Sequence, residues 1–232
     1  TREAAELGRR AAAEDLITVL AHDLRNYLTP LKARIELIRQ RAHRDHRTRD
    51  LRDAIEAAAA LDRLKRMISD LLDAGRLEQG LFTVTPIPVD LAPLVRETAS
   101  AMRTPATDIQ IHVFREVIVK ADPERIRQAL ENLLNNAVQH APPGTPVVVA
   151  LNTARQDGRM WATITVRDQG PGIPADILPQ LFERFQRGPT STGLGLGLYL
   201  AHQIALAHAG TLLAESSLGI GTCFCLSLPA GP

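Results

Sequence analysis

Two asparagines stand four residues apart in the segment ERIRQALENLLNNAVQH, which has the pattern of an amphipathic helix. Asn132 and Asn136 therefore lie on one face of that helix. Amide oxygens can coordinate Mg²⁺ without adding charge, and Mg²⁺ prefers octahedral oxygen ligands that phosphates can complete. The pair indicates a magnesium and phosphate site, although this spacing is a weak signal alone. His140 closes the same segment and is a candidate contact to the same ligand.

A second candidate site is the segment DQGPG. Asp168 ends a strand-like run, WATITVRD, and Gly170 and Gly172 follow it. A carboxylate at a strand end can accept a hydrogen bond from the exocyclic amine of adenine, and glycines permit tight turns and close backbone approach. A plain hairpin turn fits these five residues equally well.

A third candidate is the glycine-rich segment GLGLG. Gly193, Gly195 and Gly197 precede the helix-like LYLAHQIALAHAG, and backbone N–H groups at a helix start can bind phosphate. The segment does not fit a dinucleotide fold, since a third spaced glycine and a ribose-binding acid are missing, and the chain has no GxxxxGK[ST] sequence. Further along, the GIGT motif adds Gly221 and Thr222.

The residue that could receive a phosphate is His22, in the upstream segment HDLRNYLTPL. It stands two residues from the apolar positions Leu20 and Leu24, about 200° around a helix, and therefore points outward on the same side as Asn26. The adjacent Asp23 can accept the proton of one imidazole nitrogen, which leaves the other nitrogen free to attack phosphorus. Taken alone, an exposed histidine on a helix is more often an ordinary solvated side chain.

In their order along the chain, these segments resemble the motif boxes of sensor histidine protein kinases. HDLRN is similar to the H-box, NLLNNA to the N-box, LFERF to the F-box, and GLGLG and GIGT to the two later glycine boxes. The resemblance covers about residues 14 to 228. Each box is weak by itself, so the inference rests on their order.

The resemblance implies a role for each matched residue. His22 would be the phospho-acceptor, Asp23 its general base, and Asn26 the residue that positions water for phosphatase action on a partner. In the N-box, Asn136 would bind Mg²⁺ and Asn132 would support the phosphate end of ATP.

Further along, the resemblance implies that Asp168 binds adenine and that a lid over about residues 184 to 192 covers the phosphates. Phe182 and Phe185 would anchor this lid, and Arg187 is its best-placed cation for the γ-phosphate. The candidate nucleotide-binding residues are Asn132, Asn136, His140, Asp168, Gly170, Gly172, Arg187, Gly193, Gly195, Gly197, Gly221 and Thr222.

Two positions depart from the family pattern. Tyr27 stands where the H-box usually has proline, and Pro30 follows three residues later, where it removes the helix bond to the Asn26 carbonyl. Any bend near His22 is therefore displaced by about one turn. Gln139 stands where the N-box usually ends in a basic residue, which predicts weaker ATP binding.

The elements that must position these residues fall into two kinds. Apolar residues recur every three or four positions from about residue 10 to 78, which predicts two long amphipathic helices joined by the polar stretch RAHRDHRTRD. Such a two-helix hairpin is expected to dimerise into a four-helix bundle. After Gly80, short β-like runs alternate with helical stretches, which predicts an α/β sandwich, a mixed sheet with helices on one face.

We therefore expect a linker or signalling helix over residues 1–15, a dimerisation and phosphotransfer domain over 16–80, and an ATP-binding domain over 81–232. The net charge of +1 gives no field that would favour nucleic acid or an anionic membrane. No apolar run is long enough to span a membrane, which suggests a cytoplasmic fragment. Because it begins at Thr1, an upstream sensor domain is expected, and the full-length protein could be membrane-anchored through it.

The expected activity is ATP-dependent autophosphorylation of His22 in a homodimer, followed by transfer to an aspartate of a response regulator receiver domain and by phosphatase action toward it. The alternatives are a related ATPase or serine kinase of the same nucleotide-binding superfamily, and a non-catalytic dimeric scaffold.

Other candidate residues give weaker signals. His43, Asp45 and His46 are more typical of a solvated connection than of a metal site. For His202 and His208, the sequence shows no pattern that indicates an interaction partner. Cys223 and Cys225 are predicted to be small core residues.

Overall fold

The computed structural model describes residues 28–104, 107–186 and 193–231. The chain divides into two compact units, Thr1–Phe82 and Thr83–Pro232, which are described separately. In the described part of the chain, no helix is both long and apolar enough to cross a membrane.

The first unit is a helical hairpin, as the apolar spacing predicts. Residues 28–44 are helical and α2 (Thr48–Glu78) returns beside them. The Lys32 ammonium lies 2.7 Å from the Asp62 carboxylate, which ties the two helices together. The connection is shorter than expected: helix continues through most of RAHRDHRTRD, and only residues 45–47 are non-helical. Ala42, in the last turn of the first helix, is fully buried.

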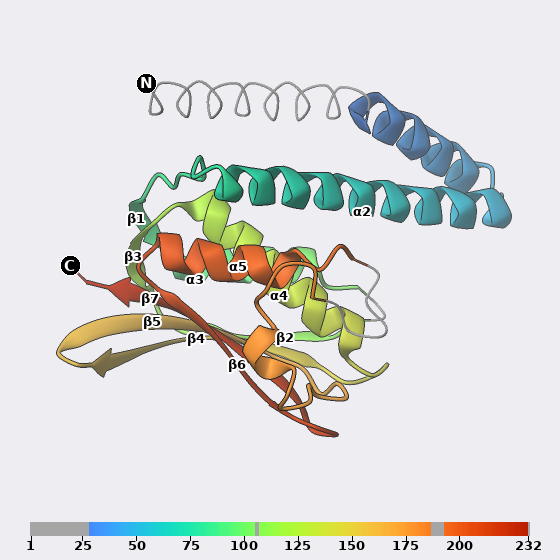
Figure 1. Cartoon of the computed structure of the whole chain (residues 1–232). Helices are drawn as coiled ribbons and strands as arrows, with labels where there is room; N and C mark the ends of the chain where they lie inside the picture. Colours follow the sequence, from blue (N-terminus) through green and yellow to red (C-terminus); the bar gives the residue numbers. More distant parts are fainter. Residues whose placement is uncertain (1–27, 105–106, 187–192, 232) are drawn as a thin grey trace, which may run out of the picture. The chain divides into compact units, whose positions relative to one another are not determined.

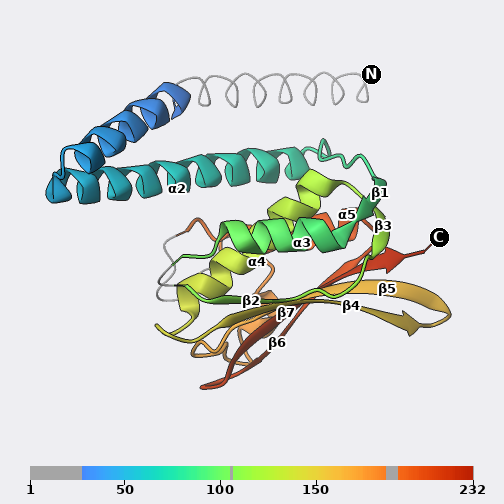
Figure 2. The same ribbon diagram turned by 180° about the vertical axis from the view of Figure 1, so that it is seen from behind.

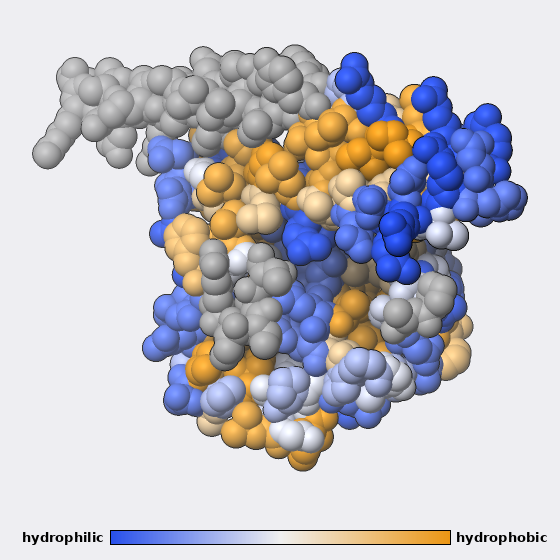
Figure 3. Space-filling model, turned by 90° about the vertical axis from the view of Figure 1, so that its right-hand side faces the viewer, coloured by the Kyte–Doolittle hydropathy of each residue, from blue (hydrophilic) through white to orange (hydrophobic). Residues whose placement is uncertain are grey.

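A hairpin of two helices cannot bury all of its apolar side chains. Ala54 and Leu61 of α2 are buried, but large hydrophobic residues elsewhere on the hairpin remain about half exposed. In Figure 3, orange hydrophobic side chains lie next to dark blue polar ones on this face of the molecule. The exposed set is Leu31, Leu37, Ile38, Ile55, Leu64 and Leu71.

The second unit is a mixed sheet with helices on one face. Figures 1 and 2 show α3, α4 and α5 stacked on the same side of the sheet. Its elements are β1 (Ile87–Asp90), α3 (Leu91–Ala101), β2 (Ile109–His112), β3 (Ile118–Ala121), α4 (Pro123–His140), β4 (Val147–Gln156), β5 (Arg159–Arg167), η1 (Leu178–Gln180), α5 (Gly197–Ala207), β6 (Thr211–Ser217) and β7 (Gly221–Ala230). The expected α/β sandwich is confirmed.

The sheet has the strand order β1-β3-β7-β5-β4-β2, and β6 pairs with β7 outside this order. Of the strand pairs in the described part of the chain, β2 and β4 run parallel, while the others are antiparallel. The long central strands β5 and β7 are in register from Met160 opposite Ala230 to Arg167 opposite Cys223. Asp168 therefore leaves β5 beside the first residues of β7.

The core lies between the sheet and its helices. Alternate residues of β7, including Phe224 and Leu226, are fully buried, as are Leu133 of α4 and Leu200 of α5. The reading of the two cysteines as core residues is wrong. Because side chains alternate along a strand, the buried phenylalanine between them sends both thiols to the opposite, partly exposed face.

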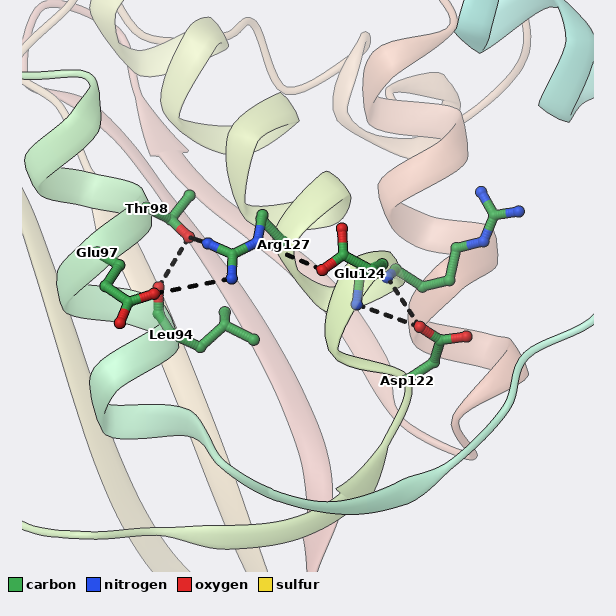
Figure 4. A network of polar contacts seen from close by, with 7 residues as sticks. Leu94, Glu97, Thr98, Asp122, Glu124 and Arg127 are labelled. Atoms are coloured by element: carbon green, nitrogen blue, oxygen red, sulfur yellow. Dashed lines mark hydrogen bonds and ion pairs between the residues drawn. The ribbon is translucent and has the colours of Figure 1, made fainter. Parts of the chain in front are cut away.

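Side-chain caps fix where the helices begin. The Asp122 carboxylate accepts hydrogen bonds from the backbone N–H groups of Glu124 and Arg125, at 3.1 and 3.2 Å, and so caps α4 (Figure 4). One turn on, the Arg127 guanidinium lies 3.3 Å from the Thr98 hydroxyl and 3.8 Å from Glu97, which links α4 to α3 (Figure 4).

Candidate functional site

Asp168 is held at the end of β5 by the backbone on both sides. Its own N–H donates to the Thr222 carbonyl at 2.9 Å. Its carboxylate Oδ1 accepts from the Gly170 N–H at 2.7 Å and from the Thr222 N–H at 3.3 Å. Among the described residues, Oδ2 has no hydrogen-bond partner. The carboxylate is therefore oriented by one oxygen and keeps the other free.

The residue itself is only 4% exposed. Burial raises the pKa of Asp168, while the hydrogen bonds from Gly170 and Thr222 and the charge of His140 pull it in the other direction. Burial dominates, and the pKa lies above that of an ordinary aspartate. A buried carboxylate with a free oxygen is suited to recognising a hydrogen-bond donor of a ligand.

Close backbone packing explains the glycines around Asp168. A Cβ at Gly170 would lie 2.8 Å from both Asp168 Oδ1 and the His140 carbonyl oxygen. A Cβ at Gly221, where φ is +130°, would lie 2.1 Å from the Asp168 carbonyl oxygen. These contacts bring together the ends of α4 and β5 and the start of β7.

The segment 168–172 is not a hairpin turn. Strand β5 pairs with β4 and β7, and the chain after it leads through a loop to η1. At Gly172, φ is +74° and a Cβ would lie 2.2 Å from the Ser217 carbonyl oxygen, so this loop packs tightly against the end of β6. The alternative interpretation of DQGPG as a simple turn is therefore wrong.

Ser216 is a residue of this site that the motifs do not reveal. Its hydroxyl accepts from the Ile173 N–H at 2.8 Å, donates to the Gly221 carbonyl at 3.0 Å and lies 2.9 Å from the Thr222 hydroxyl. It thereby joins the glycine loop to β6 and β7. A serine in an ordinary strand carries no local signal for such a role.

The asparagine helix and the glycine-rich segment meet at α4 and α5. The Asn132 amide donates to the Gly197 carbonyl at 3.1 Å, at the first residue of α5. Asn136, one turn on, is partly buried and has no hydrogen-bond partner among the described residues. Asn132 thus acts as a structural link to α5, while the Asn136 amide remains available to a ligand. Gln139, on the same helix, is exposed.

The segment before the glycine-rich motif is tied to α5 by ring contacts. Phe182 stacks on His202, with ring centroids 5.0 Å apart and planes inclined by 13°. The Arg184 guanidinium lies 5.7 Å from the centroid of the Tyr199 ring. No local sequence pattern indicates this partner of His202, because Phe182 lies 20 positions away in the chain. Burial lowers the pKa of His202, which favours its neutral form.

Phe185 is held by its backbone rather than its ring. Its N–H donates to the Gly195 carbonyl at 2.9 Å, whereas its side chain is 61% exposed. Gly195 has φ +73°, and a Cβ there would lie 2.6 Å from the Gln186 carbonyl oxygen. No described atom lies within 4 Å of a Cβ built at Gly193. Of the two phenylalanines, only Phe182 anchors this segment through its ring.

His208 also has partners that the sequence does not indicate. Its Nε2 accepts from the Asp122 N–H at 2.9 Å, and its Nδ1 lies 2.7 Å from the Ile204 carbonyl, to which it donates. It therefore joins the end of α5 to the start of α4. His22, Asp23, Asn26 and Arg187 lie outside the described residues.

Two family models match this chain, in the order that the motifs predict. Residues 12–80 match the His Kinase A (phospho-acceptor) domain. Residues 121–232 match the histidine kinase-, DNA gyrase B-, and HSP90-like ATPase family.

Curated relatives extend the similarity over nearly the whole chain. The bacteriophytochrome of Pseudomonas aeruginosa is 36% identical over 97% of this chain and 30% of its own length. The histidine-protein kinase AfsQ2 of Streptomyces coelicolor is 32% identical over 97% of the chain and 43% of its own length. The kinase/phosphatase MprB of Mycolicibacterium smegmatis is 34% identical over 93% and 46%. The chain spans less than half the length of each of these three proteins.

Solved structures agree with this assignment. Full-length ShkA in complex with AMPPNP has a TM-score of 0.69 at 24% identity, covering 94% of this chain and 46% of its own, and so shows the shared fold. The mycobacterial sensor histidine kinase MprB has a TM-score of 0.54 at 29% identity, covering 64% of this chain and 99% of its own. With both domain models in order and relatives that align across both, the chain belongs to the sensor histidine kinases and comprises their phospho-acceptor and ATPase regions.

Proposed function

We propose that this chain is the catalytic core of a two-component sensor kinase. It uses ATP to phosphorylate His22 within a homodimer and passes the phosphoryl group to an aspartate of a response regulator receiver domain. In this proposal residues 1–15 form a signalling helix or linker, 16–80 the dimerisation and phosphotransfer domain, and 81–232 the ATP-binding domain.

The observation that carries the proposal is the fixed carboxylate of Asp168. One oxygen is oriented by the N–H groups of Gly170 and Thr222, and the other has no partner among the described residues. The adenine amine is a donor of the kind that this free oxygen would accept. Gly170 and Gly221 leave room for backbone alone at this point, because a Cβ at either would collide with Asp168. The residues present therefore fit an adenine base.

The phosphate end is assigned to α4 and the start of α5. The Asn136 amide, which no described residue binds, suits one coordination position of Mg²⁺, and phosphate oxygens and water would fill the others. When bound, the ion would offset the negative charge of the transferring phosphate. Asn132 donates to the Gly197 carbonyl at the first turn of α5, whose backbone N–H groups are proposed to bind phosphate. Gln139 supplies no charge at this end of α4, so Arg187 is the cation proposed for the γ-phosphate.

The proposed chemistry at His22 needs a neutral imidazole nitrogen. Its lone pair forms a nitrogen–phosphorus bond to the γ-phosphorus as the bond to the bridging oxygen of ADP breaks. Asp23 accepts the proton from the other nitrogen and stabilises the charge that develops on the ring. Positioning of the two domains supplies most of the rate.

The test is incubation of the dimeric protein with γ-labelled ATP and Mg²⁺, followed by treatment of the labelled protein with acid or alkali. We expect an acid-labile, alkali-stable label that His22→Gln abolishes. His43→Gln is the matched control, because His43 is an exposed histidine of the same hairpin and should keep the full label. An acid-stable label would point to a serine kinase, and label retained by His22→Gln would rule out this acceptor.

Transfer and phosphatase action form the second half of the proposal. The labelled protein should lose its phosphate to an isolated receiver domain, and that transfer should fail when the acceptor aspartate of the receiver is replaced by asparagine. Asn26→Ala should leave autophosphorylation unchanged and slow dephosphorylation of the receiver, because the amide positions the attacking water. Equal phosphatase rates for the variant and the wild-type protein would contradict this role.

A further inference from the structure

The face of the sheet opposite the helices carries a pair of thiols. Cys223 and Cys225 of β7 alternate with the buried Phe224 and Leu226, and both are partly exposed. Their sulfur atoms lie 3.9 Å apart. Residues two apart on a strand share a face, so both thiols point to the same side.

The geometry of the two cysteines fits a shared metal ion better than a disulfide. A tetrahedral ion with metal–sulfur bonds of about 2.3 Å holds two thiolates ~3.8 Å apart, close to the observed 3.9 Å. Residues two apart on a strand have Cα atoms about 6.6 Å apart, near the upper end of the range of about 4.4–6.8 Å that a disulfide bridges, so a disulfide here would strain the strand. We infer that Cys223 and Cys225 form a bidentate thiolate site for a thiophilic metal ion of the Zn²⁺, Cd²⁺ and Cu⁺ class.

The neighbouring strands leave this site partly exposed, with one cationic and one anionic side chain beside it. Cys223 stands opposite Arg167 of β5 and Glu215 of β6, and Cys225 stands opposite Leu213, which is 62% exposed. The Arg167 guanidinium can offset the charge of the thiolates. On binding, two metal–sulfur bonds form and the thiol protons leave to the buffer.

The protein supplies only part of the coordination. Within the described ranges, no third cysteine, histidine, aspartate or glutamate completes a metal-binding group. Water or a small ligand must therefore fill the remaining positions, as in an open rather than a closed structural zinc site. Such an ion should exchange readily, and the fold should not depend on it.

The thiol site is separate from the nucleotide site. Thr222, which binds Asp168, is buried, whereas the next residue, Cys223, points to the opposite face. Metal binding can therefore be measured without nucleotide, and its outcome is independent of the proposed kinase activity.

The test is a titration of the reduced protein with Cd²⁺ in a buffer with a phosphine reductant, following the sulfur-to-metal charge-transfer absorption in the ultraviolet. We expect one ion per chain and a decrease of this absorption when excess Zn²⁺ competes. Cys223→Ser and Cys225→Ser should each weaken binding by at least about tenfold, because the second thiolate acts at a high effective concentration. Ser227→Ala, which alters the next position on the same face, should bind like the wild-type protein.

A second measurement uses the wild-type protein alone, in case a serine variant fails to fold. Bound Cd²⁺ should protect both cysteines from iodoacetamide, as followed by mass spectrometry of the C-terminal peptide. Cd²⁺ binding that either serine variant retains at full affinity, or equal alkylation of both thiols with and without the ion, would overturn the inference.

Discussion

The two carboxylate oxygens of Asp168 have different surroundings. Oδ1 accepts hydrogen bonds from Gly170 and Thr222 and is thereby fixed in the fold. Oδ2 has no such partner in the described part of the chain and is the oxygen proposed to accept a hydrogen bond from the ligand. Burial raises the pKa of this carboxyl, so keeping a charged acceptor in place costs the fold some stability. Recognition and stability are therefore expected to respond to Asp168 in opposite ways.

Asp168→Asn is the variant that separates the two effects. The amide oxygen can still accept from Gly170 and Thr222, but the second carboxylate oxygen is lost. We expect ATP affinity to fall roughly tenfold to a hundredfold, the value of a hydrogen bond to a charged group, while the thermal stability at neutral pH stays equal or rises. Fluorescence titration with nucleotide and thermal unfolding measure the two quantities. Asp157→Asn, in an exposed turn with φ 49° that asparagine tolerates, is the control.

The raised pKa of Asp168 also predicts a pH dependence. Because the folded pKa lies above the ordinary value, its contribution to stability is complete below the ordinary aspartate pKa and is lost as pH rises through the folded pKa. Nucleotide affinity follows the charged form, so it should fall on acidification at a higher pH than an ordinary aspartate would give. A wild-type affinity profile identical to that of Asp168→Asn would contradict this expectation.

Gly221 shows how little space the backbone leaves near Asp168. Gly221→Ala would place a Cβ 2.1 Å from the Asp168 carbonyl oxygen at φ +130°. We expect the free energy of unfolding to fall by more than about 2 kcal/mol, together with nucleotide binding. Gly219→Ala is matched, because φ there is +77° and no described atom lies within 4 Å of the added carbon. It should cost only about 1 kcal/mol of backbone strain, and equal losses in chemical denaturation would contradict the steric explanation.

At the scale of elements, α4 and α5 are joined at two levels. The Asn132 amide donates to the Gly197 carbonyl where α5 begins, and the Asp122 N–H donates to His208 just beyond its end. Phe182 then stacks on His202, in the middle of α5, and holds the segment before the glycine-rich motif. These contacts hold the two helices that carry the proposed phosphate contacts in a fixed position relative to each other.

Asp122 stabilises the start of α4 and the entry of the chain into the second unit. Its carboxylate accepts from the N–H groups of Thr85, Glu124 and Arg125. Burial raises the pKa of Asp122, but these hydrogen bonds outweigh it and hold the pKa below its ordinary value. The stabilisation is thus complete above the ordinary aspartate pKa and is lost as pH falls through the lowered folded pKa.

Asp122→Ala should lower the free energy of unfolding by about 1–2 kcal/mol at neutral pH, the usual cost of a lost N-cap. Chemical denaturation at pH 7 and at acid pH measures this difference, which should shrink as the wild-type carboxylate becomes protonated. Asp176→Ala removes an exposed carboxylate of a loop and is the control. A difference between the variant and the wild-type protein that grows on acidification would contradict a lowered pKa for Asp122.

At the scale of the whole molecule, the two units differ in how completely they bury their apolar residues. The second unit encloses a core between its sheet and three helices, whereas the hairpin leaves large side chains such as Leu64 and Leu71 at 45% and 55% exposure. Exposed hydrophobic surface of this kind marks an association site. A second copy of the hairpin, which would complete a four-helix bundle, is the partner proposed.

Leu64→Glu combined with Leu71→Glu should therefore dissociate the dimer, because each change would bury a charge in the bundle. Sedimentation equilibrium at micromolar concentration should show a dimer for the wild-type protein and a monomer for the double variant. Leu213→Glu, which changes a leucine that is 62% exposed on the sheet of the second unit, should leave the dimer intact. A wild-type monomer at this concentration would argue against the proposed assembly.

The sequence by itself determined the fold class and most of the candidate residues, because apolar spacing and glycine motifs are local signals. Two long helices, the later mixed sheet and the order of the boxes all follow from patterns within single segments. The lengths of the connections follow less well, since most of the polar stretch 41–50 is helical and only residues 45–47 form the connection.

Only the tertiary structure decided which distant residues meet. Ser216 joins the glycine loop to Thr222, His202 stacks on Phe182, and His208 binds the start of α4, although none of these pairs has a motif. It also placed the two cysteines of β7 on the outer face of the sheet. The physical reason is that such contacts depend on strand register and on the packing of helices against the sheet. Long-range order of this kind arises only when the whole core is assembled.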